Sequence, residues 1–253
     1  AAPYSVAIAD LDGDGHPDMA TANYLAASVS VLLGEGDGTF GATTDLATGA
    51  ISRSVAIEAL DGDGHLDLVT ANRDYASVSV LLGEGDGTFG AKTDFGTAHF
   101  PSCVTIGDLN GDGHPDLAAA NNGSWTVSVL LGNGNGTFGA GRRFPAGPSP
   151  VELAIGDLDG DGHLDLAVAN GNSDTVSVLL GSGDGDFGAR KTFIAGDCDV
   201  AIGDMNGDAQ PDLVTARFTY LAEMDTVSVV LGNGDGTFGV RADFPTGQGP
   251  YTL

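Results

Sequence analysis

The nine residues DLDGDGHPD at 10–18 hold four aspartates and two glycines. The carboxylates stand at the first, third, fifth and ninth positions, so alternate residues of a tightly coiled loop can turn toward one point. Calcium takes about six to eight hard oxygen ligands, and the carboxylates and the backbone carbonyl of the seventh residue offer them. The two glycines allow the positive-φ turns that the coil needs. Because the carboxylates would repel one another without a cation, the loop predicts a calcium site.

Near-copies of this loop occur five times, and a pattern repeated at a fixed period is a stronger signal than a single motif. The copies begin at Asp10, Ala59, Asp108, Asp157 and Asp204, spaced by 49, 49, 49 and 47 residues. The expected ligands, with the seventh residue acting through its carbonyl, are Asp10, Asp12, Asp14, His16 and Asp18; Asp61, Asp63, His65 and Asp67; Asp108, Asn110, Asp112, His114 and Asp116; Asp157, Asp159, Asp161, His163 and Asp165; and Asp204, Asn206, Asp208, Gln210 and Asp212. Ala59 replaces the first aspartate of the second loop, and Ala209 replaces the second glycine of the fifth. We therefore expect four to five calcium ions, with the loop at 59–67 the weakest.

Histidine stands at the seventh position of four loops, which is a reason to consider zinc. Zinc favours convergent nitrogen and sulfur ligands, whereas this set consists mostly of hard oxygens. Magnesium usually keeps several of its waters and is less suited to an all-protein cage. Calcium is therefore the expected cofactor, and ligation by histidine side chains and magnesium are the alternatives.

Each acidic loop lies between two short apolar stretches that must hold it in place. In the first repeat the stretches are SVAIAD (5–10), DMATAN (18–23), SVSVLL (28–33) and TTDLATG (43–49), and the turn GEGDGTF follows the third. Alternation, β-branched residues and glycine-rich breaks indicate strands. Four-stranded units of this length are typical of a β-propeller, whereas a parallel β-helix has shorter coils. We predict an all-β fold, a β-propeller of five four-stranded blades of about 49 residues each.

The repeats indicate a single domain that spans residues 1–253. Their approximate bounds are 3–51, 52–100, 101–149, 150–196 and 197–249. The segment PYTL at 250–253 echoes PYSV at 3–6, so we expect it to begin a sixth unit or to act as a closure strand. A fragment of a seven-bladed ring is the alternative to a ring of five.

The chain is strongly acidic, with a formal net charge of -26 from 35 acidic and 9 basic residues. This charge argues against nucleic acid and anionic membranes as partners. No apolar run reaches the ~20 residues that span a bilayer, so we expect no membrane insertion. The opening AAPYS and the calcium-type loops indicate a secreted, extracellular or cell-surface protein. Cys103 and Cys198 are too few for a disulfide framework, and they either form one bridge or remain free thiols.

The order of motifs within each repeat resembles a known family. An acidic loop of the form DxDGDGxxD after a short strand, then DLxxAN, then SVSVLLGxGDGTF, is similar to the VCBS and FG-GAP repeats, which also form the propellers of integrin α-subunits and of some lectins. The resemblance covers essentially the whole chain. It implies a propeller with calcium in the first hairpin loop of each blade, and secreted or surface roles in adhesion or ligand binding. Ala59, Ala209 and the count of five instead of seven blades depart from the family pattern.

We expect a ligand to bind on the face opposite the acidic loops. In an up-and-down blade the acidic loop and GxGDGTF share one face, and the turns after the second strand share the other face with the linkers between blades. These turns and linkers differ between repeats, and variable loops on a rigid scaffold commonly carry recognition. Their candidate ligand-binding residues are Tyr24, Arg73, Tyr75, Trp125, Arg217, Phe218 and Tyr220. They favour a glycan or an extracellular protein as ligand; aromatic residues that only cap the blade edges are the alternative.

Catalysis is not expected, and no catalytic residue is assigned. A glycosidase needs two carboxylates about 5–9.5 Å apart that have no other role. Only Glu152 and Glu223 among the glutamates fall near the variable face, and no pairing with a nearby aspartate such as Asp199 recurs between repeats. A glycan-active enzyme domain and a passive structural repeat of a larger secreted protein are the alternatives to a binding or adhesion module. Lysines and arginines on the outer strands favour a monomer.

Overall fold

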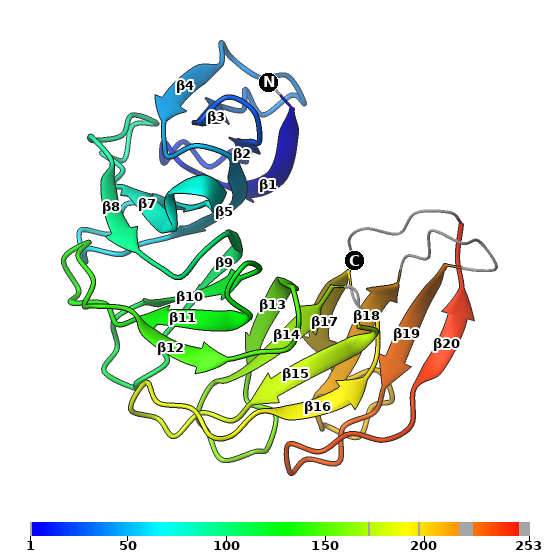
Figure 1. Ribbon diagram of the computed structural model, residues 1–253. Helices are drawn as coiled ribbons and strands as arrows, with labels where there is room; N and C mark the ends of the chain where they lie inside the picture. Colours follow the sequence, from blue (N-terminus) through cyan, green and yellow to red (C-terminus); the bar gives the residue numbers. More distant parts are fainter. Residues whose placement is uncertain (1, 172, 197, 218–224, 248–253) are drawn as a thin grey trace. The chain divides into compact units, whose positions relative to one another are not determined.

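The computed structural model describes residues 2–171, 173–196, 198–217 and 225–247. These residues form five separate four-stranded sheets, and consecutive strands are neighbours in each. Figure 1 shows the strands of each sheet side by side, as in β1 to β4 at the N-terminal end. The pairing of consecutive strands is antiparallel. In this part of the chain no helix has the length and apolar character needed to cross a membrane.

Every sheet uses the same succession of strands, which we describe as one blade. The bounds are β1 Pro3–Ala9, β2 Asp18–Asn23, β3 Ser28–Leu32 and β4 Thr44–Ala47; β5 Ser52–Glu58, β6 Asp67–Asn72, β7 Ser77–Leu81 and β8 Thr93–Gly96; β9 Pro101–Gly107, β10 Asp116–Asn121, β11 Thr126–Leu130 and β12 Arg142–Pro145; β13 Pro150–Gly156, β14 Asp165–Asn170, β15 Thr175–Leu179 and β16 Lys191–Ile194; β17 Asp199–Gly203, β18 Asp212–Arg217, β19 Thr226–Val230 and β20 Ala242–Pro245. One short 3₁₀ helix, η1 (Arg73–Tyr75), lies between β6 and β7. The all-β prediction and the four strands per repeat are confirmed.

The second strand of each blade is the most deeply buried, which explains its sequence. All six residues of β6, β10 and β14 are buried. Strands that are covered on both faces have nearly continuous apolar runs with small residues, and DLAVAN in β14 is such a run. The fourth strands β4 and β8 have three exposed positions and one half-buried position each, and all four residues of β20 are exposed. Burial therefore decreases from the second strand of each blade to its fourth.

The chain divides into two compact units. The first consists of Ala1–Ile106, Gly113–Ala119 and Ser128–Arg142, and the second of Gly107–Asp112, Ala120–Val127 and Arg143–Leu253. In the first unit one apolar cluster joins residues of the first two sheets, for example Val29, Val31 and Val55. In the second unit a similar cluster joins the fourth and fifth sheets, and it includes Val178 and Val200. Within each unit, neighbouring blades therefore pack face to face through aliphatic side chains.

A buried asparagine at the end of the second strand fixes the linker that enters the blade. Asn72 accepts a hydrogen bond from the backbone N–H of Gly49 at 3.1 Å. Its amide nitrogen donates to the hydroxyls of Ser77 and Ser79 on β7, and Ser79 donates to Asp94 on β8. Buried polar groups are stable when their partners are all present. This network gives a physical reason for the dipeptide AN that ends the second strand in the first four repeats.

Cys103 is buried and Cys198 is partly exposed. Neither thiol is needed to hold the repeats, since hydrogen-bonded sheets and apolar clusters do so.

The first glycine of each GxGDGTF turn lies against the acidic loop of its own blade. A Cβ atom on Gly83 would overlap the carbonyl oxygen of Leu66. We predict that Gly83→Ala lowers the free energy of unfolding by about 1–3 kcal/mol, because backbone atoms cannot move aside cheaply. Gly96→Ala is the matched control, since a Cβ atom at Gly96 meets nothing within 4 Å. Urea unfolding followed by circular dichroism measures both, and equal stabilities would contradict the prediction.

Candidate metal centres and the opposite face

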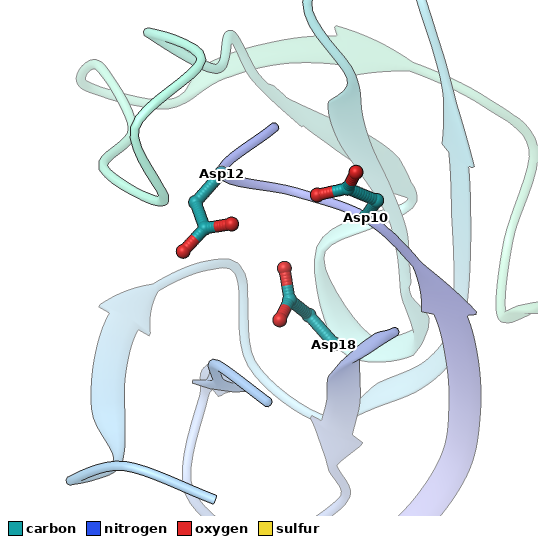
Figure 2. Close-up of side chains that lie close together, drawn as sticks. All are labelled: Asp10, Asp12 and Asp18. Carbon is teal, nitrogen blue, oxygen red and sulfur yellow. The ribbon is translucent and has the colours of Figure 1, made fainter. Parts of the chain in front are cut away.

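Three carboxylates converge in the first acidic loop. Asp10 and Asp12 follow β1, and Asp18 begins β2. One oxygen from each of these aspartates lies within 4.8 Å of the others. Figure 2 shows their side chains gathered around one region between the strand ends. Asp157, Asp159 and Asp165 form the same arrangement in the fourth loop.

The first aspartate of the loop shapes its backbone. In the first loop the carboxylate of Asp10 accepts hydrogen bonds from the N–H groups of Gly13 at 2.8 Å and Gly15 at 2.9 Å. Both glycines have positive φ, +75° and +87°, as the sequence predicts for this coil. Asp157 makes the equivalent bonds in the fourth loop. The loop is therefore organised by the same carboxylate that was assigned as its first ligand.

The ninth aspartate is the most buried of the loop, and both of its oxygens accept backbone hydrogen bonds. In the first loop Asp18 accepts from Leu11 N–H and from Gly34 N–H, each at 2.7 Å. Asp165 accepts from Leu158 and Gly181 at the same distances. The bond to the turn glycine crosses from the acidic loop to GxGDGTF. The sequence indicates this residue as a ligand but not its role in joining the two loops.

Burial raises the pKa of the ninth aspartate in two of the loops. Burial raises the pKa of Asp165 to about 6, and the repulsion from Asp159 and Asp161 adds to this, against the lowering effect of its two backbone hydrogen bonds. Burial also raises the pKa of Asp67, its counterpart in the second loop. The charged form of these groups is thus the costly one, and a bound cation would favour it.

The fifth aspartate of the first loop takes a different position from the other three. Asp14 accepts hydrogen bonds from the backbone N–H of His16 at 2.8 Å and from its ring at 3.1 Å. These bonds lower the pKa of Asp14 and raise the pKa of His16. In the fourth loop Asp161 accepts the N–H of His163. The structure therefore brings together the first, third and ninth positions, and the fifth holds the end of the coil.

The second and fifth loops keep the coil despite their substitutions. In the second loop Gly62 and Gly64 retain φ values of +80° and +88°, although Ala59 offers no carboxylate to their N–H groups. In the fifth loop Ala209 takes the glycine position with φ +66°, which costs a residue with a Cβ atom some strain. Asp204 accepts hydrogen bonds from Gly207 and Ala209, and these lower its pKa. The strain expected at Ala209 is thus offset by this hydrogen bond.

The third loop is also held by hydrogen bonds between its own residues. Its residues Gly107–Asp112 belong to the second unit. Asp108 accepts from Gly111 N–H at 2.7 Å, and Asn110 donates to Asp112 at 2.9 Å. In the first unit, Asp116 accepts from the turn glycine Gly132. The bonds of Asp108 and Asp116 repeat those of the first and fourth loops, and the bond of Asn110 is repeated by Asn206 in the fifth.

The seventh side chain of each loop packs on the GxGDGTF turn of its own blade. A Cβ atom on the second glycine of each turn would collide with that side chain. The pairs are Gly36 with His16, Gly85 with His65, Gly134 with His114, Gly183 with His163 and Gly234 with Gln210. The contact occupies the histidine rings and leaves the backbone carbonyl as the group expected to face a cation. The sequence contains a signal for this packing contact, because a glycine recurs in each turn at the position that faces the histidine.

A backbone hydrogen bond also links an acidic loop to the turn of the following blade. In the first unit Gly136 N–H donates to Leu60 O at 3.1 Å, and in the second unit Gly236 N–H donates to Leu158 O at 3.2 Å. The leucine is the second residue of the loop, and it is buried. The loop thus contacts both its own turn and that of the next blade. Sequence reasoning missed this contact because it joins different repeats.

The variable turns contain the aromatic residues that the sequence analysis names as ligand-binding candidates. Tyr75 and Trp125 are exposed, and the guanidinium of Arg73 lies over the ring of Phe100 at 4.7 Å. Tyr24 stacks on Tyr4 with ring centroids 5.6 Å apart. Phe100 was not among the candidates, although its place in the linker HFPSC is on this face. Phe218 and Tyr220 lie outside the residues that the structure describes.

Arg217 is held by a bidentate ion pair, whereas Arg73, the other arginine among the candidates, has a single 3.4 Å contact with Asp74. The guanidinium of Arg217 donates two hydrogen bonds to the carboxylate of Asp174, at 2.9 and 2.8 Å. Such a bidentate pair fixes both side chains in one geometry. Arg217 therefore helps to fix the turn that contains Asp174.

At two recurring places in the repeat, the turn after the second strand and the linker between blades, non-glycine residues adopt the left-handed backbone conformation. The last residue of the turn after the second strand has φ near +50°, as in Ala27, Ala76, Trp125 and Asp174. The linker residues Ile51, Phe100 and Ser149 have φ between +52° and +59°. A bulky residue is uncommon in this conformation and costs about 1 kcal/mol or more. The turn backbone therefore fixes the direction in which the side chains of Trp125 and Phe100 leave the main chain.

A comparison with protein families identifies the repeats. The model of the FG-GAP-like repeat matches four overlapping stretches, residues 10–70, 60–119, 108–168 and 157–215. The chain belongs to the FG-GAP-like repeat family. Each matched stretch of this FG-GAP-like chain begins in one acidic loop and ends just after the next, so the match rests on the motif that recurs. No curated protein sequence matches the chain.

Solved structures resemble this FG-GAP-like chain in fold. A proposed 6-phosphogluconolactonase from Bacteroides uniformis aligns with a TM-score of 0.74 and 16% identity, over 98% of this chain and 73% of its own. An Agrocybe aegerita lectin, described for specific recognition of non-reducing terminal N-acetylglucosamine, aligns with a TM-score of 0.60 and 21% identity, over 94% of this chain and 65% of its own. The V. cholerae biofilm matrix protein Bap1 aligns with a TM-score of 0.59 and 17% identity, over 98% of this chain and 41% of its own. This chain therefore spans less than two thirds of the lectin and of Bap1, and at these identities the likeness concerns the fold alone.

The raised pKa values predict how the stability of the metal-free protein depends on pH. A group whose pKa is higher in the folded state loses its contribution as pH rises through that value, and this holds for Asp165 and for His16. We predict that in chelator the free energy of unfolding falls between about pH 5 and about pH 7. Aspartates with lowered pKa, such as Asp14, are ionised throughout this range and do not reverse the trend. Urea unfolding at both pH values measures the free energy of unfolding. A rise of this free energy toward pH 7 would show that the buried aspartates do not dominate its pH dependence.

Proposed function

We propose that this chain is a calcium-stabilised β-propeller of five blades that binds a glycan or protein ligand on the face opposite its acidic loops. The single observation that carries the proposal is the contrast between the two ends of the blades. At one end the loops repeat the same acidic motif, and at the other end the turns differ and expose Tyr75, Phe100 and Trp125. Stability and recognition are thereby assigned to opposite ends.

The residues of the acidic loops fit calcium. Asp10, Asp12 and Asp18 offer converging carboxylate oxygens, which are the ligands that calcium prefers. The ninth aspartate is buried, and in the fourth loop its raised pKa indicates that burial disfavours the ionised form, which a positive charge would stabilise. These loops, of the kind found in calcium-bearing VCBS and FG-GAP repeats, would hold four to five ions. The calcium would supply the charge that lets the carboxylates remain ionised at short range.

Binding is supported on the variable face by aromatic residues with fixed backbones. Exposed rings stack on sugars and act as anchors in protein interfaces, because they bury a large area with few rotatable bonds. Trp125 has its N–H and C=O engaged with Asn121 and Ala146, so its backbone does not need to reorganise on binding. In the first unit the cationic group of Arg73 beside Phe100 adds a hydrogen-bond donor next to an aromatic surface. A lectin of similar fold is in keeping with a glycan ligand.

The carboxylates of this face support binding rather than catalysis. Asp174 is paired with Arg217, and Asp74 lies 3.4 Å from Arg73. Carboxylates in ion pairs are poor candidates for the acid and base of a glycosidase, which must change protonation during the reaction. The enzyme named among the similar structures shares the fold, and a fold by itself does not assign a reaction.

The proposed location is outside the cell or at its surface. Extracellular modules bind calcium with dissociation constants of about 10⁻⁴–10⁻³ M, which matches the calcium available there. The net charge of -26 is also best balanced where divalent cations are abundant.

Calcium should raise the stability of the protein through the complete loops more than through the second. We predict that calcium at ~100 times the dissociation constant stabilises by about 2.7 kcal/mol per site and that chelator reverses this. Asp157→Asn, which removes a converging carboxylate, should reduce the calcium-dependent rise in Tm more than Asp61→Asn in the loop that contains Ala59. Thermal unfolding with calcium and with chelator measures both variants. An unchanged Tm of the wild type in chelator would refute the calcium proposal.

Ligand binding should depend on the exposed aromatic residues of the variable face. We predict that Trp125→Ala weakens a specific hit on a glycan or matrix-protein array by about 10-fold or more, the loss of one aromatic anchor. Val240→Ala, an exposed apolar residue between the GxGDGTF turn and β20, is the control and should leave the hit unchanged. Turnover of a polysaccharide panel that is lost with Glu152→Gln would instead favour the enzyme alternative.

A further inference from the structure

The acidic loops of neighbouring blades are joined by a continuous path of hydrogen bonds. In the second unit the path starts at Asp165, the ninth residue of the fourth loop, which accepts the N–H of Leu158 at 2.7 Å. The carbonyl of Leu158 accepts the N–H of Gly236, in the GNGDGTF turn (232–238) of the fifth blade, at 3.2 Å. At the start of this turn Gly232 donates its N–H to Asp212 at 2.8 Å. Asp212 is the ninth residue of the fifth loop, so the path ends in the next acidic loop.

The same path occurs in the first unit. Asp67 accepts the N–H of Leu60 at 2.7 Å, and the carbonyl of Leu60 accepts the N–H of Gly136 at 3.1 Å. Gly132, at the start of the same turn, donates its N–H to Asp116 at 2.7 Å. The leucine is buried in both paths, so water does not compete for its peptide groups. A path that is found in both units is a property of the repeat.

The turn of the fifth blade is held from two sides. On the side of the fourth blade, Lys191 on β16 donates to the carbonyl of Gly236 at 3.4 Å, so that blade binds both the N–H and the C=O of Gly236. Within the fifth blade, a Cβ atom on Gly234 would overlap the side chain of Gln210. Gln210 is the seventh residue of the fifth loop, whose carbonyl is an expected ligand. The position of the turn therefore depends on the fourth blade and affects the shape of the fifth loop.

The fourth loop is the better built of the two. It has four carboxylates, and those of Asp157, Asp159 and Asp165 converge. The fifth loop has three carboxylates, because Asn206 stands at its third position, and Ala209 holds a φ of +66°. The affinity of such a loop for calcium depends on the number of its charged ligands and on its rigidity. The fourth loop should therefore bind calcium first, and the fifth is the loop that gains from a neighbour already in place.

We propose that calcium binding is positively cooperative between neighbouring blades, and that the fourth loop primes the fifth through the turn at 232–238. This inference rests on the proposed calcium sites and concerns the regulation of their occupancy. When the fourth loop is ordered, Leu158 is fixed, and with it Gly236 and its turn. The fifth loop then has less conformational freedom to lose when it orders in turn. By linkage, occupancy of the fifth loop strengthens the fourth by the same factor.

Charge acts against this cooperativity. A cation in one loop repels a cation in the next, but salt screens exposed charges over about 8 Å at 0.15 M ionic strength. The hydrogen-bond path is less sensitive to salt, because its leucine is buried. Moderate salt therefore weakens the opposing effect and leaves the coupling through the turn. The consequence is that neighbouring blades become ordered together over a narrow range of calcium concentration.

The test follows the fifth loop by NMR of methionine methyl groups while calcium is added to the full chain. Met205 is the second residue of the fifth loop, and Met19 follows Asp18 of the first, so the two loops have separate reporters. The variant Asp157→Asn with Asp159→Asn disables the fourth loop. We expect it to raise the calcium concentration at the midpoint of the Met205 shift by about 5-fold or more, as is typical of coupled sites. Met19 gives the reference titration, and its midpoint should change less.

A second variant controls for the loss of charge. Asp184→Asn with Asp186→Thr removes two charges from the fourth blade outside its acidic loop. Asparagine stands at the first of these positions in the third repeat, and threonine stands at the second in the other four repeats. The midpoint of the Met205 shift should remain close to that of the wild type.

A third variant weakens the link without a change of charge. Gly236 has a φ of +68°, and a Cβ atom there would crowd the side chain of Leu180, whereas a Cβ atom on Gly239 would meet the carbonyl of Leu231 at an ordinary 3.5 Å. We expect Gly236→Ala to raise the midpoint of the fifth loop in the wild type and to have little further effect when the fourth loop is disabled. Gly239→Ala is the matched control and should leave the midpoint unchanged.

The outcomes separate the cooperativity from the calcium sites themselves. Circular dichroism in calcium reports whether each variant is folded. Equal midpoints for the fifth loop with an intact and a disabled fourth loop would overturn the cooperativity and leave the calcium sites in place. An equal shift from the charge control would also overturn it, because lost charge would then explain the effect. If neither Met205 nor Met19 responds to calcium, the proposed calcium sites fail, and the cooperativity fails with them.

Discussion

The structure depends on a buried aspartate that begins the second strand of each blade. In the first, second and fourth blades its two oxygens accept the N–H of the second loop residue and the N–H of the first glycine in the GxGDGTF turn, as Asp18 does with Leu11 and Gly34. One carboxylate therefore joins the acidic loop, the second strand and the turn after the third strand. A buried charge is costly unless it is hydrogen-bonded and compensated. The same group thus fixes the end of the loop and is one whose ionised form a bound cation would stabilise.

Packing between blades follows from the loop that this aspartate holds. The second loop residue donates its N–H to the aspartate and, where a blade follows in the same unit, accepts an N–H from the next turn, as Leu158 does from Gly236. Glycine is favoured at that turn position, since Gly236 has a φ of +68° and a Cβ atom there would also crowd the end of the Leu180 side chain. The proposed metal loops are therefore part of the contact between blades. Loss of a cation would affect the neighbouring blade as well as its own hairpin.

The opposite end of the blades has a different physical basis. Its turns are held by backbone bonds and by residues in the left-handed region, of which Trp125 and Phe100 are the bulkiest. These positions are strained, and strain persists where the surrounding structure compensates for it. A rigid turn that exposes a large ring has little entropy to lose on binding. This end can therefore vary in sequence without disturbing the hydrogen-bonded loops at the other end.

The sequence by itself determined the repeat, the four strands per blade and the carboxylate-rich loops, because strand alternation, positive-φ glycines and the spacing of carboxylates are local properties of the chain. It also predicts that Trp125 and Tyr75 lie on the variable face. Only the tertiary structure decided which carboxylates of the first and fourth loops converge, that Arg217 is bound to Asp174, and that Leu60 accepts a bond from Gly136. The last two contacts join residues that are distant along the chain, and local periodicity carries no information about which distant groups meet.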